Sequence, residues 1–170
     1  MSFRVIPNFD KCLKSIDQPH FFIQDGDDQE PAYITEEDGE FQIINNTNCP
    51  INFLPIDSCV YGSSDISRCD CSVYNEKTFC FIELKCIKPK NFNKKRKEAE
   101  DQLEITIKEF KNEEIVHGKT LEAYVSLNCQ IKINDNFEPI TQQPTNKTKA
   151  AHFLLTFSTK LYYNTKKEFN

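Results

Sequence analysis

The chain has 170 residues, a length typical of one domain, and carries a formal net charge of -5 with a sequence pI near 5.3. A chain of this length can bury a core large enough to fold without disulfides or metals as staples. The acidic balance excludes a generic polyanion binder, so any contact with nucleic acid must come from a local basic patch. We therefore expect a single domain over residues 1–170.

The first half of the chain predicts short strands separated by polar turns. Phe9, Cys12 and Leu13 share one face of a helix, and Asp38-Gly39 is a favoured turn pair between two apolar runs. The elements expected here are a helix at 8–16, an acidic loop at 24–31, a hairpin at 32–45, a strand at 51–57 and a loop at 62–67.

The second half predicts a buried hairpin, a long amphipathic helix and further strands. The run from Phe79 to Ile82 is continuously apolar, which indicates burial on both faces of a strand. Leu103, Ile107 and Phe110 fall on one face of a helix. The elements expected here are strands at 68–74 and 78–86 around a tight turn at 75–77, a basic loop at 88–97, a helix at 95–114 ended by Gly118, a strand at 120–131, a polar loop at 137–150 and a hairpin or bent strand at 152–164. This order predicts an α/β (α+β) layer architecture with a central mixed β-sheet flanked by helices.

Three charged residues fall on the two strands of the buried hairpin. Glu83 and Lys85 are two apart on one strand and therefore share a face, and the tight turn is expected to bring Asp70 beside Glu83. Two converging carboxylates repel each other, and a hard divalent cation relieves that repulsion. Lys85 beside them would stabilise charge on a scissile phosphate or position the attacking water. The pattern predicts a metal-dependent phosphodiester-cleaving centre, with Asp70 and Glu83 as the metal ligands.

The same residues also have a simpler interpretation. Glu-x-Lys is a common pattern, and the chain contains a second one, Glu109-Phe110-Lys111, within the predicted helix. In this interpretation Glu83 and Lys85 form an exposed ion pair on an edge strand. Exposed ion pairs contribute little to stability. The context distinguishes Glu83 and Lys85, because they end a buried apolar strand and an aspartate stands on the preceding strand.

The run RCDCSVYNEKTFCFIELKC, followed by AEDQLEITIKEF, resembles the core of the PD-(D/E)XK nucleases, the restriction endonuclease-like superfamily. It is similar to small bacterial members that carry a CD…(I/V)ELK pair and then a QLExTI helix, and the resemblance covers roughly residues 51–131. The resemblance implies an αβββαβ core. The site residues that it implies are Asp70 and Glu83 as metal ligands, Lys85 as the catalytic lysine and Gln102 on the following helix as a further site-facing residue.

Two features of the chain leave this resemblance open. Cys69 stands where the named motif has proline. Many members also use an acid from the first helix, and the candidates for that acid here are Asp10, Asp17, Glu30, Glu36 and Glu37. The activity that the resemblance implies is hydrolysis of nucleic acid, of DNA more than RNA, by a water that Mg²⁺ or Mn²⁺ activates. It also implies a setting of bacterial defence against foreign DNA.

Six basic residues precede or open the predicted helix, where the helix dipole favours acids. The unfavourable placement indicates a use, and a phosphate backbone is the candidate ligand. The alternative is a solvated loop that balances an acidic chain. The predicted nucleic-acid contacts are Lys88, Lys90, Lys94, Lys95, Arg96 and Lys97.

The eight cysteines are interpreted as reduced thiols of a cytoplasmic protein. The segment MSFRVIPNFDKC lacks the apolar run of a secretory signal, and no stretch approaches the length of a membrane span, so neither secretion nor a membrane is expected. The four cysteines between residues 69 and 86 fall in apolar strand-like segments, where free cysteine packs as a small hydrophobe.

Other functions compete with the nuclease. The cysteines lack a CxxC pair and predict a zinc site only weakly, and His20, His117 and His152 stand without a motif for a cysteine–histidine nucleophile. A non-catalytic binding or immunity-type protein that keeps the nuclease fold is a stronger alternative. The presence of Asp70, Glu83 and Lys85 argues against it, because an inactive site usually loses one of these residues. A nuclease subunit active only within a larger complex is another, because the chain has no DNA-reading module and would need a homodimer or a partner protein to choose its substrate.

Overall fold

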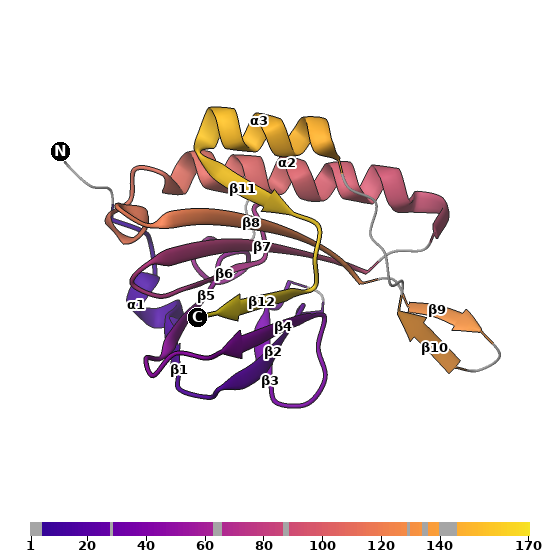
Figure 1. Ribbon diagram of the computed structural model, residues 1–170, viewed down its shortest axis with the longest axis horizontal. Helices are drawn as coiled ribbons and strands as arrows, with labels where there is room; N and C mark the ends of the chain where they lie inside the picture. Colours follow the sequence, from indigo (N-terminus) through magenta and orange to yellow (C-terminus); the bar gives the residue numbers. More distant parts are fainter. Residues whose placement is uncertain are drawn as a thin grey trace.

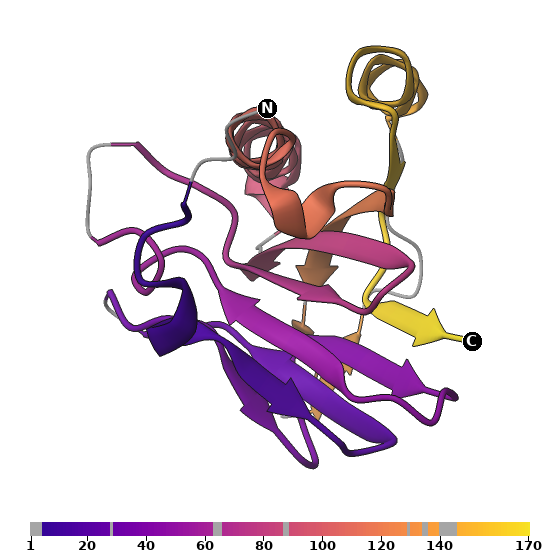
Figure 2. The same cartoon turned by 90° about the vertical axis from the view of Figure 1, so that its left-hand side faces the viewer.

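The computed structural model describes residues 5–27, 29–62, 66–86, 89–128, 130–133, 136–139 and 146–170. Its main body has three layers, which are two long helices, a six-stranded mixed sheet and a four-stranded mixed sheet (Figures 1 and 2). The helices α2 (Phe92–Phe110) and α3 (Lys147–Phe157) cover one face of the six-stranded sheet, and the four-stranded sheet packs on the other. The predicted mixed α/β architecture is confirmed, but the two long helices flank only one face.

The six-stranded sheet has the order β1-β5-β6-β7-β8-β11. Neighbours from β1 to β7 are antiparallel, and β8 and β11 continue the sheet parallel to β7. The helix α2 connects β7 to β8 across the helix-covered face, and α3 precedes β11. The strands of this sheet are β1 Lys14–Ile16, β5 Ile51–Pro55, β6 Cys71–Tyr74, β7 Thr78–Cys86, β8 Thr120–Asn128 and β11 Thr159–Tyr162.

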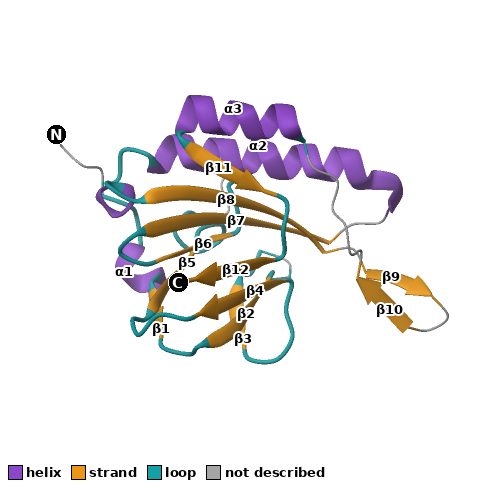
Figure 3. Ribbon diagram, in the orientation of Figure 1, coloured by secondary structure: helices purple, strands orange, loops and turns teal. Residues whose placement is uncertain are grey.

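The four-stranded sheet has the order β12-β4-β2-β3, with β2 antiparallel to both of its neighbours and β12 parallel to β4. A separate two-stranded sheet of β9 and β10 extends away from the main body beyond the end of β8 (Figure 3). The strands are β2 His20–Gln24, β3 Tyr33–Thr35, β4 Phe41–Asn45, β12 Lys166–Phe169, β9 Gln130–Ile133 and β10 Asn136–Pro139. No helix in the described ranges combines the length and the apolar character that crossing a bilayer requires.

The predicted hairpin at 32–45 is wrong in its pairing, although both of its strands exist. β3 and β4 do not pair with each other, because β2 lies between them and pairs with both. The reason is burial: Phe21 and Ile23 of β2 are fully buried against the main sheet, whereas β3 has no buried residue. The more apolar strand therefore takes the central position.

The predicted helix at 8–16 is shorter than expected. Helix α1 covers only Phe9–Cys12, and the backbone at Leu13 turns extended. Residues Lys14–Ile16 then pair with β5 as the edge strand of the main sheet. Pairing with β5 gives the backbone of this segment partners in the main sheet.

The second half differs from the prediction at three places. Helix α2 begins at Phe92, after the short 3-10 helix η1 (Pro89–Asn91), so most of the predicted basic loop is helical. Residues 152–157 belong to α3 and not to a strand, because Phe153 and Phe157 are buried four residues apart and the Asn146 side chain caps the helix by accepting from Lys149 N. The strand at 120–131 is divided into β8 and β9, and part of the predicted loop at 137–150 lies outside the described residues.

The central strand β7 is buried on both faces, as predicted. Phe79 and Phe81 point to the helices, where their rings pack 6.2 Å and 5.8 Å from the ring of Phe110. Cys80 and Ile82 point to the four-stranded sheet. The helix-side row continues to Glu83, which places a fully buried carboxylate beside an aromatic core.

A buried ion pair joins β12 to the main sheet. Lys167 Nζ lies 2.7 Å from Glu122 Oε2, and Tyr124 Oη donates to the same oxygen at 2.7 Å. Burial raises the pKa of Glu122, but the bonds from Lys167 and Tyr124 outweigh burial and hold the pKa below its ordinary value. Glu122 therefore stays charged at neutral pH and needs its cation.

Candidate active site

The structure brings the predicted triad together. Asp70 immediately precedes β6 and lies opposite Glu83 of β7, because the register pairs Cys71 with Ile82. Asp70 N donates to Glu83 Oε2 at 3.1 Å, and Leu84 N donates to Asp70 Oδ2 at 2.6 Å. The two carboxylates are thus held in place by backbone N–H groups of each other's segments.

Lys85 completes this cluster from the next position on the same face of β7. Its Nζ lies 2.7 Å from Glu83 Oε1, with Glu83 fully buried and the Lys85 side chain 21% exposed. This is not the exposed surface pair of the simpler interpretation, because a buried carboxylate has little access to solvent screening. The ammonium group sits where it can also reach a ligand that approaches from solvent.

Burial and neighbouring charges shift the pKa of all three groups. Burial, and then the charge of Glu83, raise the pKa of Asp70 well above its ordinary value. Burial raises the pKa of Glu83 to about 7, although Lys85 opposes the rise. Burial lowers the pKa of Lys85, but Glu83 outweighs it and the net shift is upward. The site therefore holds two carboxylates that resist ionising together and one firmly charged ammonium.

Gln102 lies on α2 beside this cluster, but its described contact is with the backbone. Its Nε2 donates to the carbonyl of Arg68 at 3.2 Å, and the neighbouring Thr106 Oγ1 accepts from Cys69 N at 2.8 Å. Arg68 in turn forms an ion pair with Glu109 at 2.6 Å. Helix α2 thus holds the residues just before Asp70. Glu109, of the second Glu-x-Lys tripeptide, contributes by its ion pair with Arg68.

The acid that sequence reasoning missed is Asp25, which directly follows β2. Its charge acts on Asp70, Glu83 and Lys85, and its own pKa is raised by burial. Asp57, after β5, also acts on Lys85 and Asp25. The charges that act most strongly on Asp70 and Glu83 include none of the five candidate acids Asp10, Asp17, Glu30, Glu36 and Glu37. The signal that could have found Asp25 is the acidic run that follows an alternating strand, QDGDDQE.

The donor set of this site suits a hard divalent cation. In the described part of the chain, no three His, Cys, Asp or Glu side chains are grouped closely enough to hold a metal ion by themselves. Mg²⁺, however, usually keeps several waters and binds through one or two carboxylates and the phosphates of a substrate. The Asp70 and Glu83 side chains converge, and the charge of Glu83 raises the pKa of Asp70, an effect that a cation would relieve. These residues therefore fit Mg²⁺ or Mn²⁺.

The cysteines of the described residues are not grouped for zinc, and two of them correct the expectation of reduced thiols. Cys69, which precedes β6, packs on the helix side of the main sheet, whereas Cys71 and Cys80 pack on the other side, so they do not converge on one site. Cys12 and Cys59 form a disulfide that links α1 to the segment after β5. The free cysteines of the described residues are Cys49, Cys69, Cys71, Cys80 and Cys86.

The predicted basic segment lies at the start of α2, near the triad. Lys85 and Glu98 of α2 interact electrostatically, which places the first turns of the helix beside the end of β7 (Figure 1). Lys95 and Arg96 form ion pairs along the helix with Glu98 and Glu100. The residues left exposed, with no ion pair to any described residue, are Lys90, Lys94 and Lys97, and Lys88 lies outside the described residues.

The start of α2 also lacks the features that usually stabilise a helix N-terminus. No acid stands in its first turn, and the Asn91 side chain makes no capping bond. The positive end of the helix dipole and the three exposed lysines therefore add up at the start of α2. Such a surface attracts phosphate groups.

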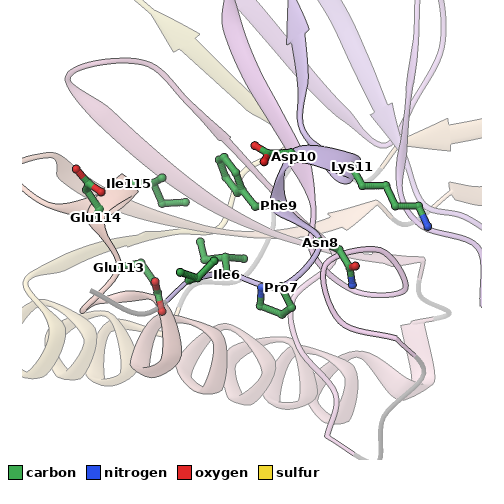
Figure 4. Close-up of a pocket in the computed structure, with 10 residues that line it drawn as sticks. Ile6, Pro7, Asn8, Phe9, Asp10, Lys11, Glu113, Glu114 and Ile115 are labelled. Carbon is green, nitrogen blue, oxygen red and sulfur yellow. The ribbon is translucent and has the colours of Figure 1, made fainter. Parts of the chain in front are cut away.

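A hollow of the described surface lies away from the triad. It has a volume of about 670 Å³ between α1 and the 3-10 helix η2 (Glu114–Val116), where Ile6, Phe9 and Ile115 form an apolar lining (Figure 4). None of the predicted catalytic residues lines it.

Comparison of the chain with protein-family models, curated proteins and solved structures finds no match.

Proposed function

We propose that this protein is a Mg²⁺- or Mn²⁺-dependent nuclease that hydrolyses phosphodiester bonds, in DNA more than RNA. The observation that carries the proposal is the meeting of Asp70 and Glu83 across adjacent strands, with Lys85 beside them. The element order α1-β5-β6-β7-α2-β8 supports the finer assignment to a restriction endonuclease-like αβββαβ core. In this assignment the four-stranded sheet is an addition to the core.

Each residue of the site has a distinct role in the proposed reaction. A divalent cation supplies Lewis-acid chemistry when bound. Asp70 and Glu83 hold the cation, and the N–H groups of Asp70 and Leu84 keep the two carboxylates convergent. Lys85 offers its charged ammonium to the phosphate oxygens, where negative charge grows in the transition state. Gln102 keeps the segment before Asp70 in place.

The test is metal binding and nicking by an Asp70→Asn variant. We expect the wild type to bind Mn²⁺ in calorimetry and to nick supercoiled plasmid, and we expect the variant to do neither, because a neutral amide is a poor ligand for a hard cation. Asp38→Asn is the matched control, since Asp38 is exposed in the turn before β4. A wild type that binds no metal would contradict the proposal.

One observation favours the alternative of a protein that is inactive by itself. Glu83 is fully buried, and Lys85 already neutralises it at 2.7 Å. A partner or a larger complex would then be needed to separate the pair and admit a cation. Under this alternative the wild type binds metal but leaves plasmid DNA and single-stranded RNA intact in the same assay.

The exposed lysines of α2 are expected to bind the phosphate backbone. Changing Lys90, Lys94 and Lys97 together to glutamine should weaken DNA binding and reduce the slope of log K against log salt by about three, because each lysine that neutralises a phosphate releases about one counterion. Fluorescence anisotropy over a salt series measures both quantities. The control triple variant is Lys77→Gln, Lys111→Gln and Lys160→Gln, whose side chains are exposed elsewhere. Equal slopes for the two variants would contradict the prediction.

A further inference from the structure

The backbone of Asp70 is held by the segment that follows β5. Ile56 N and Asp57 N both donate to the carbonyl oxygen of Asp70, at 2.9 Å and 3.3 Å. The two ends of the connection from β5 to β6 are therefore hydrogen-bonded to each other. Any movement of residues 56–60 acts directly on the residue that carries the first carboxylate of the site.

Helix α1 fixes this segment from the outside. The disulfide joins Cys12 of α1 to Cys59, and Asn8 Nδ2 donates to the carbonyl of Val60 at 3.2 Å. Helix α1 has only four residues, which is too short to be stable by itself. The covalent bond is thus the strongest connection between α1 and residues 56–60.

Helix α2 holds the far end of the connection by polar contacts, which join Glu109, Gln102 and Thr106 to Arg68 and Cys69. Near the disulfide its contact is apolar, because the ring of Phe110 packs 6.5 Å from the ring of Tyr61. When the disulfide is open, the near end of the connection keeps the hydrogen bonds to Asp70 and Asn8 and the packing of Ile56, Val60 and Tyr61, but it loses its covalent bond to α1.

We propose that the Cys12–Cys59 disulfide is a redox switch for the site at Asp70, with the oxidised protein active and the reduced protein impaired. This inference rests on the proposed function, because it concerns the regulation of the same site. The reductant is a dithiol: its two thiols are oxidised to a disulfide, and two electrons and two protons pass to the sulfurs of Cys12 and Cys59. Cys59 is partly exposed and gives the reductant access, whereas Cys12 is 2% exposed.

The expected effect is a loss of plasmid nicking of about tenfold or more on reduction, because small displacements of a reacting group cost large factors in rate. The assay uses Mg²⁺, since dithiols bind Mn²⁺. The variant Cys12→Ala/Cys59→Ala should be slow in both oxidised and reduced buffer, and Cys49→Ser, which removes an exposed free thiol, should respond as the wild type does. Thiol counting in denaturant confirms which state each sample holds.

A second measurement separates this inference from the proposed function. Hydrogen exchange followed by mass spectrometry should show faster exchange at residues 56–60 and 69–71 after reduction, whether or not the protein cuts DNA. If neither state nicks any nucleic acid, the proposed function fails and the exchange data alone decide the inference. Unchanged exchange in these segments, equal nicking rates in the two states, or a full set of free thiols in the oxidised sample would overturn it.

Discussion

Replacing Lys85 with methionine is expected to lower the rate of plasmid nicking by about 10²–10³-fold, the range found when one charge-stabilising donor is removed from an active site. Lys85 Nζ lies 2.7 Å from Glu83 and is the cation of the triad. Without it, no ammonium group remains in the triad to meet the charge that develops on the phosphate. The rate is measured under single-turnover conditions with saturating Mg²⁺, so that weaker metal binding does not mimic a slower chemical step.

The chain itself supplies a control for this prediction. Lys111 belongs to the second Glu-x-Lys tripeptide and is exposed just after α2, so Lys111→Met removes the same charge from the same sequence pattern. We expect Lys111→Met to nick at the wild-type rate. Lys85→Met should stay folded, because Glu83, whose pKa is already raised to about 7 by burial, becomes protonated when its cation is lost. Equal rates for the two variants would refute the role of Lys85.

The Lys167→Met variant is expected to lose about 3 kcal/mol of unfolding free energy, because it leaves the charge of Glu122 buried without its cation. The side chains of Lys167 and Glu122 are only 13% and 11% exposed, so water cannot replace the lost partner well. Adding Glu122→Gln should recover most of the loss, since the neutral amide oxygen still accepts from Tyr124. Urea unfolding followed by circular dichroism measures all three proteins.

The neighbouring lysine provides the comparison. Lys166 pairs with Glu168, but both side chains are more than two-fifths exposed. Lys166→Met should therefore change stability by less than about 1 kcal/mol, as is usual for surface pairs. If Lys166→Met and Lys167→Met destabilise equally, the pair with Glu122 does not hold the two sheets together.

The hairpin of β6 and β7 could be predicted from local sequence because its signals are local. An apolar run, a three-residue turn and a residue spacing of two fix which side chains share a face. These signals placed Asp70, Glu83 and Lys85 together without any knowledge of the rest of the chain. The same locality explains why the bounds of β7 are as predicted.

Asp25 could not be found in this way, because its position depends on how two sheets pack. It follows β2, which belongs to the four-stranded sheet, and it reaches Asp70 only through the contact between the sheets. Nothing in the local pattern states that β2 would separate β3 from β4. The disulfide between Cys12 and Cys59 was missed for a similar reason, since its partners are 47 residues apart in sequence.

Helix α3 was mistaken for a strand because aromatic and apolar residues follow one another in HFLLTF. The sequence also holds the opposite signal, in the spacing of four between Phe153 and Phe157 and in a capping asparagine. Leu154 and Leu155, which are 52% and 85% exposed, are the residues that made the run look continuously apolar. Short apolar runs of this length fit both the helical and the strand period, and only the packing of α3 on β11 decides between a helix and a strand.

The strand β12 has a consequence for the order in which the protein is built. It pairs with β4 from Lys166↔Gln42 to Phe169↔Asn45, so a strand made late completes a sheet whose other three strands are made early. During synthesis on the ribosome, the edge of β4 has to wait unpaired while the whole main sheet emerges. A nascent chain stalled before residue 166 thus presents an open, apolar sheet edge, the kind of surface that chaperones bind and that pairs wrongly with other chains.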